Sequence, residues 1–296
     1  MPHIYFWTLG LIWGSSFIYM KMAAEYITPT QIVLIRIFFG FIPIAIFALA
    51  TRALKLSHWK HIHHLTVLSL IGTIAYYYGF AKGASQLYSG VVGALSGLTP
   101  IFSYLLALLL IADEKAQVKK IMGIATGFCG VIFIARPLGA DISQASLNGV
   151  LFTLIGSFSI GASFVYVKKF VLPLQIPASA LITYQLGIGI LILMLLTDLE
   201  GIENIYLDRY TALGLVVGLG ILGTGVAYIL YYFIIEKMGA VTASSVAYVP
   251  PIIALAIGVI LGERITLWDY AGAALILFGV ILINRETPKT SPKTAT

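Results

Sequence analysis

Long apolar runs separated by short polar loops are the feature that most limits how this chain can fold. A membrane-spanning helix needs about 20 mostly apolar residues, and the sequence offers ten such runs. They lie at 4–22, 30–50, 65–82, 89–111, 121–135, 149–167, 178–197, 212–235, 241–261 and 270–284. The runs lack the alternation of a membrane β-barrel, and lipid satisfies no backbone hydrogen bond. We therefore predict an all-α membrane protein with ten transmembrane helices.

The composition agrees with a membrane location. Apolar residues make up 59% of the chain and charged residues only 10%, whereas charged residues approach a quarter of a typical soluble domain. The net charge is +6, but the basic residues are spread through the loops and form no nucleic-acid-binding face. We predict a multi-pass protein of the plasma membrane, or of the cell inner membrane in a Gram-negative cell. Its predicted partners are the lipid bilayer and a small-molecule substrate. We predict no nucleic-acid partner.

The orientation follows from the basic residues, because cytoplasmic loops carry the excess of Lys and Arg. One side of the predicted topology holds twelve of the 18 basic residues: Arg52, Lys55, Lys60, Lys115, Lys119, Lys120, Lys168, Lys169, Lys237, Arg285, Lys289 and Lys293. The other side holds five: Lys21, Lys82, Arg136, Arg209 and Arg264. The richer side is predicted to be cytoplasmic, with both termini on it.

An internal repeat covers nearly the whole chain. Residues 14–21 recur as residues 161–168, at an offset of 147. We place the first five-helix repeat at 1–137 and the second at 147–285, followed by a disordered cytoplasmic tail at 286–296. Each copy holds an odd number of spans, so the second must be inverted in the membrane. Inverted repeats are a recurring design of secondary transporters, because two similar halves can exchange conformations.

Short motifs in both repeats carry a resemblance to a known family. They are Trp13-Gly14-Ser15-Ser16-Phe17, Arg36, Pro100 followed by Glu114, and Pro250 followed by Gly262-Glu263-Arg264. Their order and spacing resemble the paired repeats of EamA-type transporters in the drug/metabolite transporter superfamily. The resemblance implies ten helices, cytoplasmic termini, a central cavity, and export or exchange of small metabolites such as amino acids. Asp113 departs from the glycine that is usual before the glutamate.

Helix interruptions and deep polar aromatic residues suggest where a substrate binds. Pro100 and Pro250 interrupt equivalent runs, which points to a central site, although proline kinks are common in membrane helices. Tyr residues normally collect at the interface, so deep ones either line a cavity or serve helix packing. The predicted substrate-binding residues are Trp13, Ser16, Tyr19, Tyr77, Tyr78, Ser96, Tyr228, Tyr231 and Tyr248.

Five residues are assigned a structural or gating role: Arg36, Pro100, Glu114, Pro250 and Glu263. Arg36 lies inside a span, where an unpaired charge is costly. It can hold a structural carbonyl or acid, bind a substrate carboxylate, or extend toward the interface. Its repeat partner Thr183 is neutral. Glu114 and Glu263 close equivalent spans and are expected to cap or pair, with proton sensing as the alternative.

Glycines spaced for close helix contact occur near the end of each repeat. Gly123 and Gly130 match Gly272 and Gly279 in their spacing of seven residues. Small residues let membrane helices approach closely. The glycines can pack the fifth helix against the tenth or support a dimer. We predict a monomer and keep a homodimer as the alternative.

No catalytic constellation is visible, and we predict no catalytic residue, cofactor or metal site. His58, His61, His63 and His64 crowd one loop, where a metal site is conceivable, but no carboxylate or cysteine joins them and we favour a solvated loop. We predict a secondary transporter that exports or exchanges small amphipathic metabolites, amino acids first among them, by alternating access around a central cavity. A carrier of lipid-linked or other hydrophobic cargo is the alternative, followed by an intramembrane enzyme.

Overall fold

The computed structural model describes residues 2–112, 114, 116–135, 144–239 and 245–284, and it is all-helical over these residues. This confirms the predicted fold class at the level of secondary structure. The α-helices are α1 (Pro2–Ala23), α2 (Pro29–Ala50), α3 (Ile62–Ser69), α4 (Tyr76–Ala84), α5 (Ser89–Ser96), α6 (Thr99–Leu110), α7 (Val118–Ala135), α8 (Gln144–Tyr166), α9 (Ala178–Leu196), α10 (Arg209–Leu213), α11 (Ala227–Met238), α13 (Val249–Ile260) and α14 (Leu267–Asn284). The predicted tail at 286–296 lies outside the described residues.

Among the described residues, six helical stretches are long and apolar enough to cross a membrane, and two shorter apolar helices lie at Val246–Ile260 and Leu267–Ile283. The helices follow the apolar runs of the sequence. Many large apolar side chains point outward, among them Leu195 at 86% exposure and Leu109 at 80%. Exposed leucines in such number are costly in water and favourable in lipid. The chain is a multi-pass membrane protein.

The start of α2 illustrates how local sequence sets a helix end. The Thr28 hydroxyl accepts a hydrogen bond from the Gln31 backbone N–H, and the Gln31 side chain accepts one from the Thr28 N–H. This reciprocal capping box satisfies two backbone donors that the first turn leaves without helical partners. Pro29 occupies the same first turn, where its missing N–H costs nothing. The helix therefore begins at residue 29.

Three stretches of the described residues form π-helices, which were not predicted. Residues Leu70–Ala75 form a π-helix between α3 and α4, residues Val167–Val171 form one after α8, and residues Gly214–Val226 form one between α10 and α11. In a π-helix each backbone N–H donates to the carbonyl five residues earlier, instead of four as in an α-helix. Such segments are rare and occur frequently at functional sites. The longest of the three, Gly214–Val226, is named the π-segment below.

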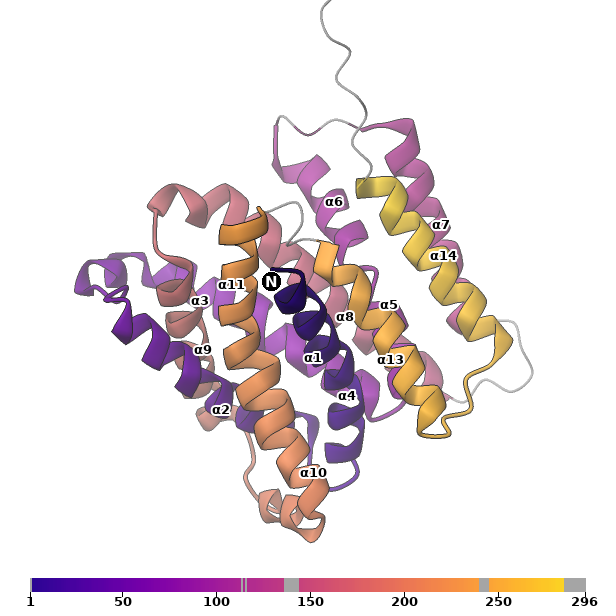
Figure 1. The fold of residues 1–296 in the computed structure, drawn as a ribbon, viewed down its shortest axis with the longest axis horizontal. Coiled ribbons are helices and arrows are strands. Elements are labelled where there is room, and N and C mark those ends of the chain that lie inside the picture. Colours follow the sequence, from indigo (N-terminus) through magenta and orange to yellow (C-terminus); the bar gives the residue numbers. More distant parts are fainter. Residues whose placement is uncertain (1, 113, 115, 136–143, 240–244, 285–296) are drawn as a thin grey trace, which may run out of the picture.

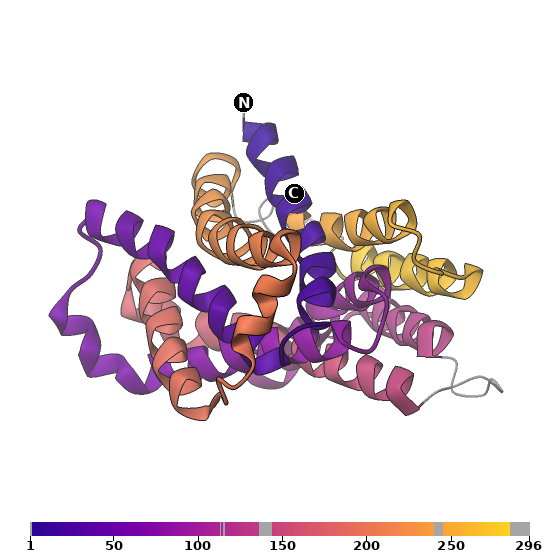
Figure 2. The same ribbon diagram turned by 90° about the horizontal axis from the view of Figure 1, so that it is seen from below.

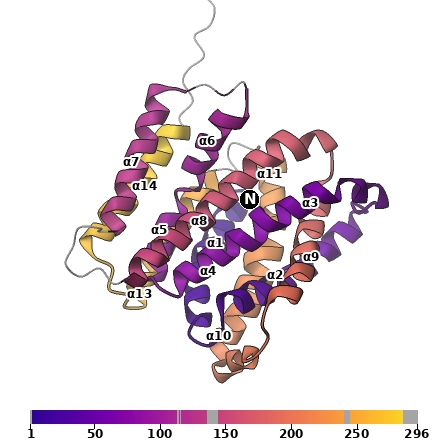
Figure 3. The same ribbon diagram turned by 180° about the vertical axis from the view of Figure 1, so that it is seen from behind.

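The helices pack around a central α1. This helix contacts α4, α5, α11, α13 and the π-segment, and Figure 1 shows it between the other helices. On one side α7 and α14 run next to each other, as Figures 1 and 2 agree. On the opposite side lie α2, α3 and α9, seen from behind in Figure 3. Helix α8 packs against both α4 and α6.

The α7–α14 pair is held together by the glycines singled out in the sequence. A Cβ atom added at Gly123 would lie 2.5 Å from the Gly279 carbonyl oxygen, and one added at Gly130 would lie 2.5 Å from the Gly272 carbonyl oxygen. The low-numbered glycine of α7 meets the high-numbered glycine of α14, so the two helices are antiparallel. The glycines therefore serve internal packing, which was one of the two alternatives.

Candidate functional site

The most unusual side chain of the bundle is Arg36, which is only 3% exposed. It lies seven residues into α2, on a buried stripe with Ile32 and Gly40 at helical spacing of four. Its Nε–H donates to the Thr224 hydroxyl at 3.0 Å. One terminal nitrogen donates to the Gly223 carbonyl at 3.4 Å, and the other faces the Met20 sulfur at 3.8 Å. An arginine stays charged at every relevant pH, so the interior of this bundle holds a positive charge.

Aromatic rings surround the guanidinium group. Its central carbon lies 3.9 Å from the centroid of the Tyr77 ring, in cation–π geometry. The Tyr76 ring is next to that of Tyr77, with centroids 4.3 Å apart. Tyr228 on α11 is close enough for its phenol to interact with the Tyr77 side chain. Tyr77 and Tyr228 were both predicted as substrate-binding residues, and they lie together beside Arg36.

The π-segment supplies the backbone and hydroxyl groups that Arg36 contacts. Thr224 donates its hydroxyl hydrogen to the Leu219 carbonyl five residues earlier, at 3.0 Å, which is the π-helical spacing. A Cβ atom added at Gly40 would lie 2.6 Å from the Thr224 Cβ, and one added at Gly225 would lie 2.6 Å from the Gly40 carbonyl oxygen. Only glycine permits this approach. The close crossing is what delivers Arg36 to residues 223 and 224.

Two predicted residues of α1, Ser16 and Tyr19, pack against glycines of the π-segment. Ser16 is 3% exposed and donates to the Ile12 carbonyl within its own helix. A Cβ atom at Gly223 would lie 3.0 Å from the Ser16 hydroxyl oxygen. The Tyr19 ring packs over Gly214, where an added Cβ would come within 2.6 Å of a ring carbon. Ser16 and Tyr19 thus pack against the π-segment, and the Ser16 hydroxyl is engaged within its own helix.

The second half of the chain holds a neutral counterpart of the Arg36 contact. Gln185 on α9 donates to the Thr73 hydroxyl at 2.8 Å, and both side chains are buried. Thr183, the repeat partner of Arg36, bonds to the Ser179 carbonyl in its own helix at 2.7 Å. Ser163, the repeat partner of Ser16, packs against Gly72, whose added Cβ would lie 3.1 Å from the Ser163 Cβ.

The remaining predicted substrate residues have other partners. Trp13 packs on Tyr231 with ring centroids 5.7 Å apart, and Tyr78 meets Phe152 of α8 edge-on at 6.0 Å. Ser96 donates to the Gly93 carbonyl of its own helix at 2.6 Å. Tyr248 packs against a separate core formed by α5, α6, α7, α13 and α14. The predicted set therefore divides among three cores, with Tyr78 in the core of Tyr77 and Tyr228, Trp13 and Tyr231 in a second, and Tyr248 in a third.

The matched prolines each start a new helical segment. Pro100 lies in the first turn of α6, after α5 ends at Ser96. Pro250 lies in the first turn of α13, directly after the short 3₁₀ turn Val246–Tyr248. A proline in a first turn loses no hydrogen bond. Both prolines therefore sit at helix interruptions in the interior of the protein.

The two predicted glutamates have partners. Glu114 pairs with Lys120 at the start of α7, with 3.1 Å between the carboxylate and the amine. Glu263 accepts hydrogen bonds from the Ser89 N–H at 2.8 Å and the Gly90 N–H at 3.1 Å, so it caps the first turn of α5. Its carboxylate ties the loop after α13 to the first half of the chain.

Further contacts join the two halves at both ends of the bundle. At one end the Gln31 side-chain amide donates to the carbonyls of Asp198 at 2.8 Å and Glu200 at 2.9 Å. At the other end the Tyr184 hydroxyl donates to the Lys55 carbonyl and accepts from its N–H, both at 3.1 Å. These hydrogen bonds tie the start of α2 to the loop after α9, and the loop after α2 to α9 itself.

A hollow of roughly 210 Å³ opens beside α2, away from the buried face that carries Arg36. Its lining is almost entirely apolar and comes from α2, the 3₁₀ segment Ile202–Leu207 and the π-segment: Ile35, Phe39, Ile202, Glu203, Ile205, Tyr206, Ala212, Leu215 and Val216. Its polar lining is too sparse to orient a polar substrate.

Sequence reasoning missed several residues of the Arg36 cluster. Thr224, Gly223 and Met20 contact Arg36 directly but were not selected. Thr224 carried a signal, since it is a hydroxyl residue between two glycines in the middle of an apolar run. Met20 carried none. Among the described residues, no group of three or more His, Cys, Asp or Glu side chains is arranged to hold a metal ion.

Comparisons with known proteins find one family model and several full-length relatives. The EamA-like transporter family matches residues 1–136 and again residues 147–285. An uncharacterized transporter of Archaeoglobus fulgidus is 24% identical over 278 residues, covering 93% of this chain and 95% of that protein. The uncharacterized transporter YoaV of Bacillus subtilis is 27% identical, with coverage of 93% and 94%. The uncharacterized inner membrane transporter YedA of Escherichia coli K12 is 25% identical, with coverage of 93% and 88%. One crystal structure, 16% identical, has a TM-score of 0.60 over 95% of both chains and shares the fold.

Proposed function

The chain belongs to the EamA-like transporter family, and on that premise we propose that it is a secondary transporter that exports or exchanges small amphipathic metabolites. Amino acids are the first class to test. Transport proceeds by alternating access, in which two similar halves rock around a site between them. The proposal extends the family assignment to a substrate class, a direction and a mechanism.

The observation that carries this proposal is the cluster of polar aromatic side chains around the buried Arg36. Tyr76 and Tyr77 come from α4, Tyr228 from α11, and Thr224 from the π-segment. Phenol rings offer faces for an apolar substrate body and hydroxyl groups that orient polar atoms. A core that served packing alone has no need of a charge, because apolar side chains fill such space at lower cost.

Matched contacts support the arrangement as two inverted five-helix repeats, residues 1–137 and 147–285, with ten membrane helices in all. The contact of Arg36 with Thr224 joins α2 to the π-segment, and the contact of Gln185 with Thr73 joins α9 to the shorter π-helix before α4. The glycines of α7 and α14 meet reciprocally. Such pairing is what an inverted repeat produces, because each contact of one half recurs in the other.

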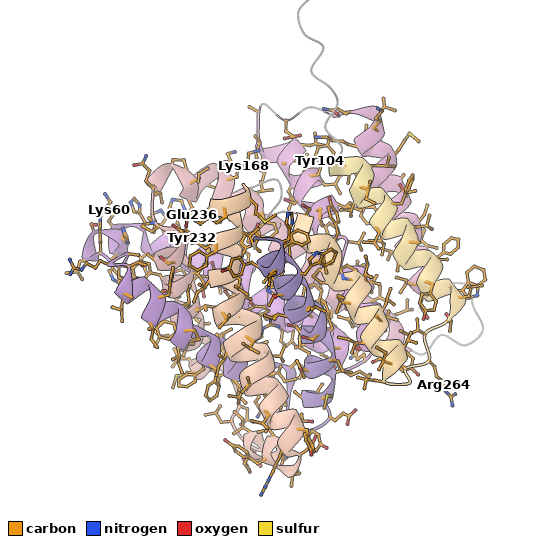
Figure 4. All side chains as sticks on the ribbon, viewed as in Figure 1. Lys60, Tyr104, Lys168, Tyr232, Glu236 and Arg264 are labelled. Carbon is orange, nitrogen blue, oxygen red and sulfur yellow. The ribbon has the colours of Figure 1, made fainter. Side chains whose placement is uncertain are left out.

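The proposed orientation has both termini in the cytoplasm. Figure 4 has Lys60 and Lys168 toward one end of the bundle and Arg264 toward the other, in agreement with the basic residues counted above. Reporter domains fused at Thr296 and within the 198–208 loop test this directly. We expect the first to report from the cytoplasm and the second from outside. The reverse pattern would overturn the orientation and leave the fold unaffected.

Transport by purified protein in liposomes tests the function. We expect counterflow of at least one radiolabelled amino acid above that of empty liposomes, and little counterflow from a Pro100→Ala, Pro250→Ala double variant, which replaces the matched prolines at the two helix interruptions. If no metabolite moved while the protein stayed folded, the metabolite reading would fail. Movement of a fluorescent lipid-linked sugar in the same liposomes would then support the lipid-cargo alternative.

A further inference from the structure

We propose that Arg36 is the anion-binding residue of the transport site and that it takes the carboxylate of a small organic substrate. This inference rests on the proposed transport function and narrows its substrate class. It assigns to Arg36 a direct role in binding, beyond the structural or gating role predicted from the sequence. In this proposal Arg36 contributes the positive charge that binds the carboxylate, and the surrounding tyrosine rings contact the rest of the substrate.

The first argument is the charge balance. In the part of the chain that the structure describes, the polar partners of the Arg36 guanidinium are the Thr224 hydroxyl, the Gly223 carbonyl and the Met20 sulfur, and none of them is a carboxylate. A buried charge without a counter-ion is unfavourable in a low-dielectric interior. Neutral dipoles from Thr224 and Gly223 offset this cost only in part. An incoming carboxylate supplies the missing opposite charge.

The second argument is that the present partners are weak enough to be exchanged. A guanidinium group has five N–H donors in a planar fork. Only the contact to Thr224 is at an ordinary hydrogen-bond length of 3.0 Å. The contact to the Gly223 carbonyl is longer at 3.4 Å, and the Met20 sulfur at 3.8 Å is a weak acceptor. A carboxylate can bind two of these donors side by side with stronger, charge-assisted hydrogen bonds.

The third argument concerns what else is in the cluster. The Tyr77 ring lies 3.9 Å from the guanidinium carbon and fixes its plane, and Tyr76 lies next to it. These rings are complementary to an apolar or aromatic substrate body, and their faces also attract an ammonium group. The cluster thus suits a carboxylate on a compact organic skeleton, with or without an amine.

Binding to the purified full-length protein tests the proposal. The probes are L-phenylalanine, L-leucine and 3-phenylpropionate, each compared with the amide of its carboxyl group. We expect the wild type to bind at least one carboxylate more tightly than its amide. Arg36→Gln should weaken carboxylate binding by roughly 10- to 100-fold, as expected for loss of hydrogen bonds to a charged group. The Arg36→Lys variant should bind carboxylates with an affinity between those of the wild type and Arg36→Gln, because lysine keeps the positive charge but lacks the planar, two-pronged donor set of arginine.

The matched control is Gln185→Met, which removes the equivalent buried polar contact on α9 and leaves Arg36 intact. It should change carboxylate and amide binding alike. A second variant, Thr224→Val, removes the resting partner of the Nε–H with little change in volume. We expect it to strengthen carboxylate binding a few-fold relative to amide binding, because the freed Nε–H then donates to the carboxylate. A purely structural arginine would produce no such selective gain, so this variant decides the question even if Arg36→Gln fails to fold.

The result that would overturn the proposal is equal binding of carboxylates and amides by the wild type, or carboxylate binding that Arg36→Gln and Thr224→Val leave unchanged. These outcomes are separable from failure of the proposed function. A wild type that transports the amides and ignores the carboxylates would remain a transporter without an anion site. A wild type that binds carboxylates through Arg36 but moves none of them would keep the anion site and overturn transport.

Discussion

Single polar residues inside this bundle are tied to partners that come from distant parts of the sequence. Arg36 contacts residues almost 190 positions later, and Glu263 reaches back to the first turn of α5. In lipid, a polar group that lacks a partner cannot turn to water. Each of these side chains therefore helps to fix which helices lie next to each other.

Removal of the Glu263 carboxylate should destabilise the protein. Its two oxygens accept from the Ser89 and Gly90 N–H groups, and loss of a helix cap costs about 1–2 kcal/mol. We expect Glu263→Ala to lower the melting temperature in detergent, with Glu263→Gln intermediate because one acceptor remains. Glu25→Ala is the matched control, since Glu25 is an exposed carboxylate near the start of the α1–α2 loop. Equal melting of both alanine variants would contradict the capping role.

His64 makes the stability of the bundle end sensitive to pH. Its Nδ1 lies 2.7 Å from the Tyr166 hydroxyl oxygen. Burial, followed by the neighbouring His63 and His61, lowers the pKa of His64 from its usual value of about 6.5. Below that pH the unfolded chain binds more protons than the folded chain, so stability falls as the pH decreases through about 6.5. This stability is retained above that pH, where the imidazole is neutral in both states.

The His64→Gln variant isolates this contribution. We expect the wild type to lose more thermal stability than the variant when the pH is lowered from about 7.5 to about 5.5. His61→Gln is the control, because it removes a neighbouring imidazole but leaves the contact with Tyr166. Melting curves in detergent at the two pH values measure the difference. An identical loss in wild type and His64→Gln would mean that other groups cause the pH dependence.

The depth and type of the site residues could be predicted from the sequence, but their partners could not. Arg36, Tyr77 and Tyr228 were recognised because a charge or a phenol inside an apolar run requires a reason. Thr224 was missed because its approach to Arg36 depends on the glycine crossing of α2 and on the π-helical register. Ser96 and Tyr248 were expected near the same site, yet depth alone does not say which face of a helix meets which neighbour.

Helices in this chain divide into regular ones that pack and irregular ones that carry polar contacts. The α7–α14 pair is regular, and its glycines allow backbone-to-backbone contact. The π-segment and the π-helix at Leu70–Ala75 instead offer Thr224 and Thr73 to side chains of other helices. The apolar runs predicted the positions of both kinds. The π-helical register was not predictable, because it arises from packing between helices.

Adding a single methyl group at the α7–α14 crossing should loosen the pair. A Cβ at Gly130 would lie 2.5 Å from the Gly272 carbonyl oxygen, so Gly130→Ala forces the two backbones apart. Overpacking of this kind costs about 1–3 kcal/mol, and we expect a clear fall in melting temperature. Gly187→Ala on α9 is the matched control, because its nearest neighbour, a Phe41 ring carbon, is at an ordinary 3.4 Å. Equal effects would indicate that the crossing tolerates separation.

At the scale of the whole molecule, contacts between the two halves fall into a fixed group and an exchangeable group. The glycine crossing of α7 and α14 is close-packed and without polar side chains. The contacts of Gln31 with Asp198 and Glu200, and of Tyr184 with Lys55, are hydrogen bonds at the ends of the bundle that can break singly. If the halves rock, the α7–α14 crossing is the natural pivot.

Locking the end of the bundle at Gln31 should therefore stop transport, while locking the pivot should not. The Gln31 amide lies 2.9 Å from the Glu200 carbonyl oxygen, and alternating access requires these two positions to separate. In a Cys129→Ala background, a short thiol cross-linker between Gln31→Cys and Glu200→Cys should reduce counterflow to that of empty liposomes, with recovery on reduction. The same cross-linker between Phe133→Cys and Trp268→Cys, whose native rings on α7 and α14 are 5.5 Å apart, should leave counterflow intact. Undiminished transport through the first cross-link would exclude rocking at this end, and loss of transport through the second would exclude α7–α14 as the pivot.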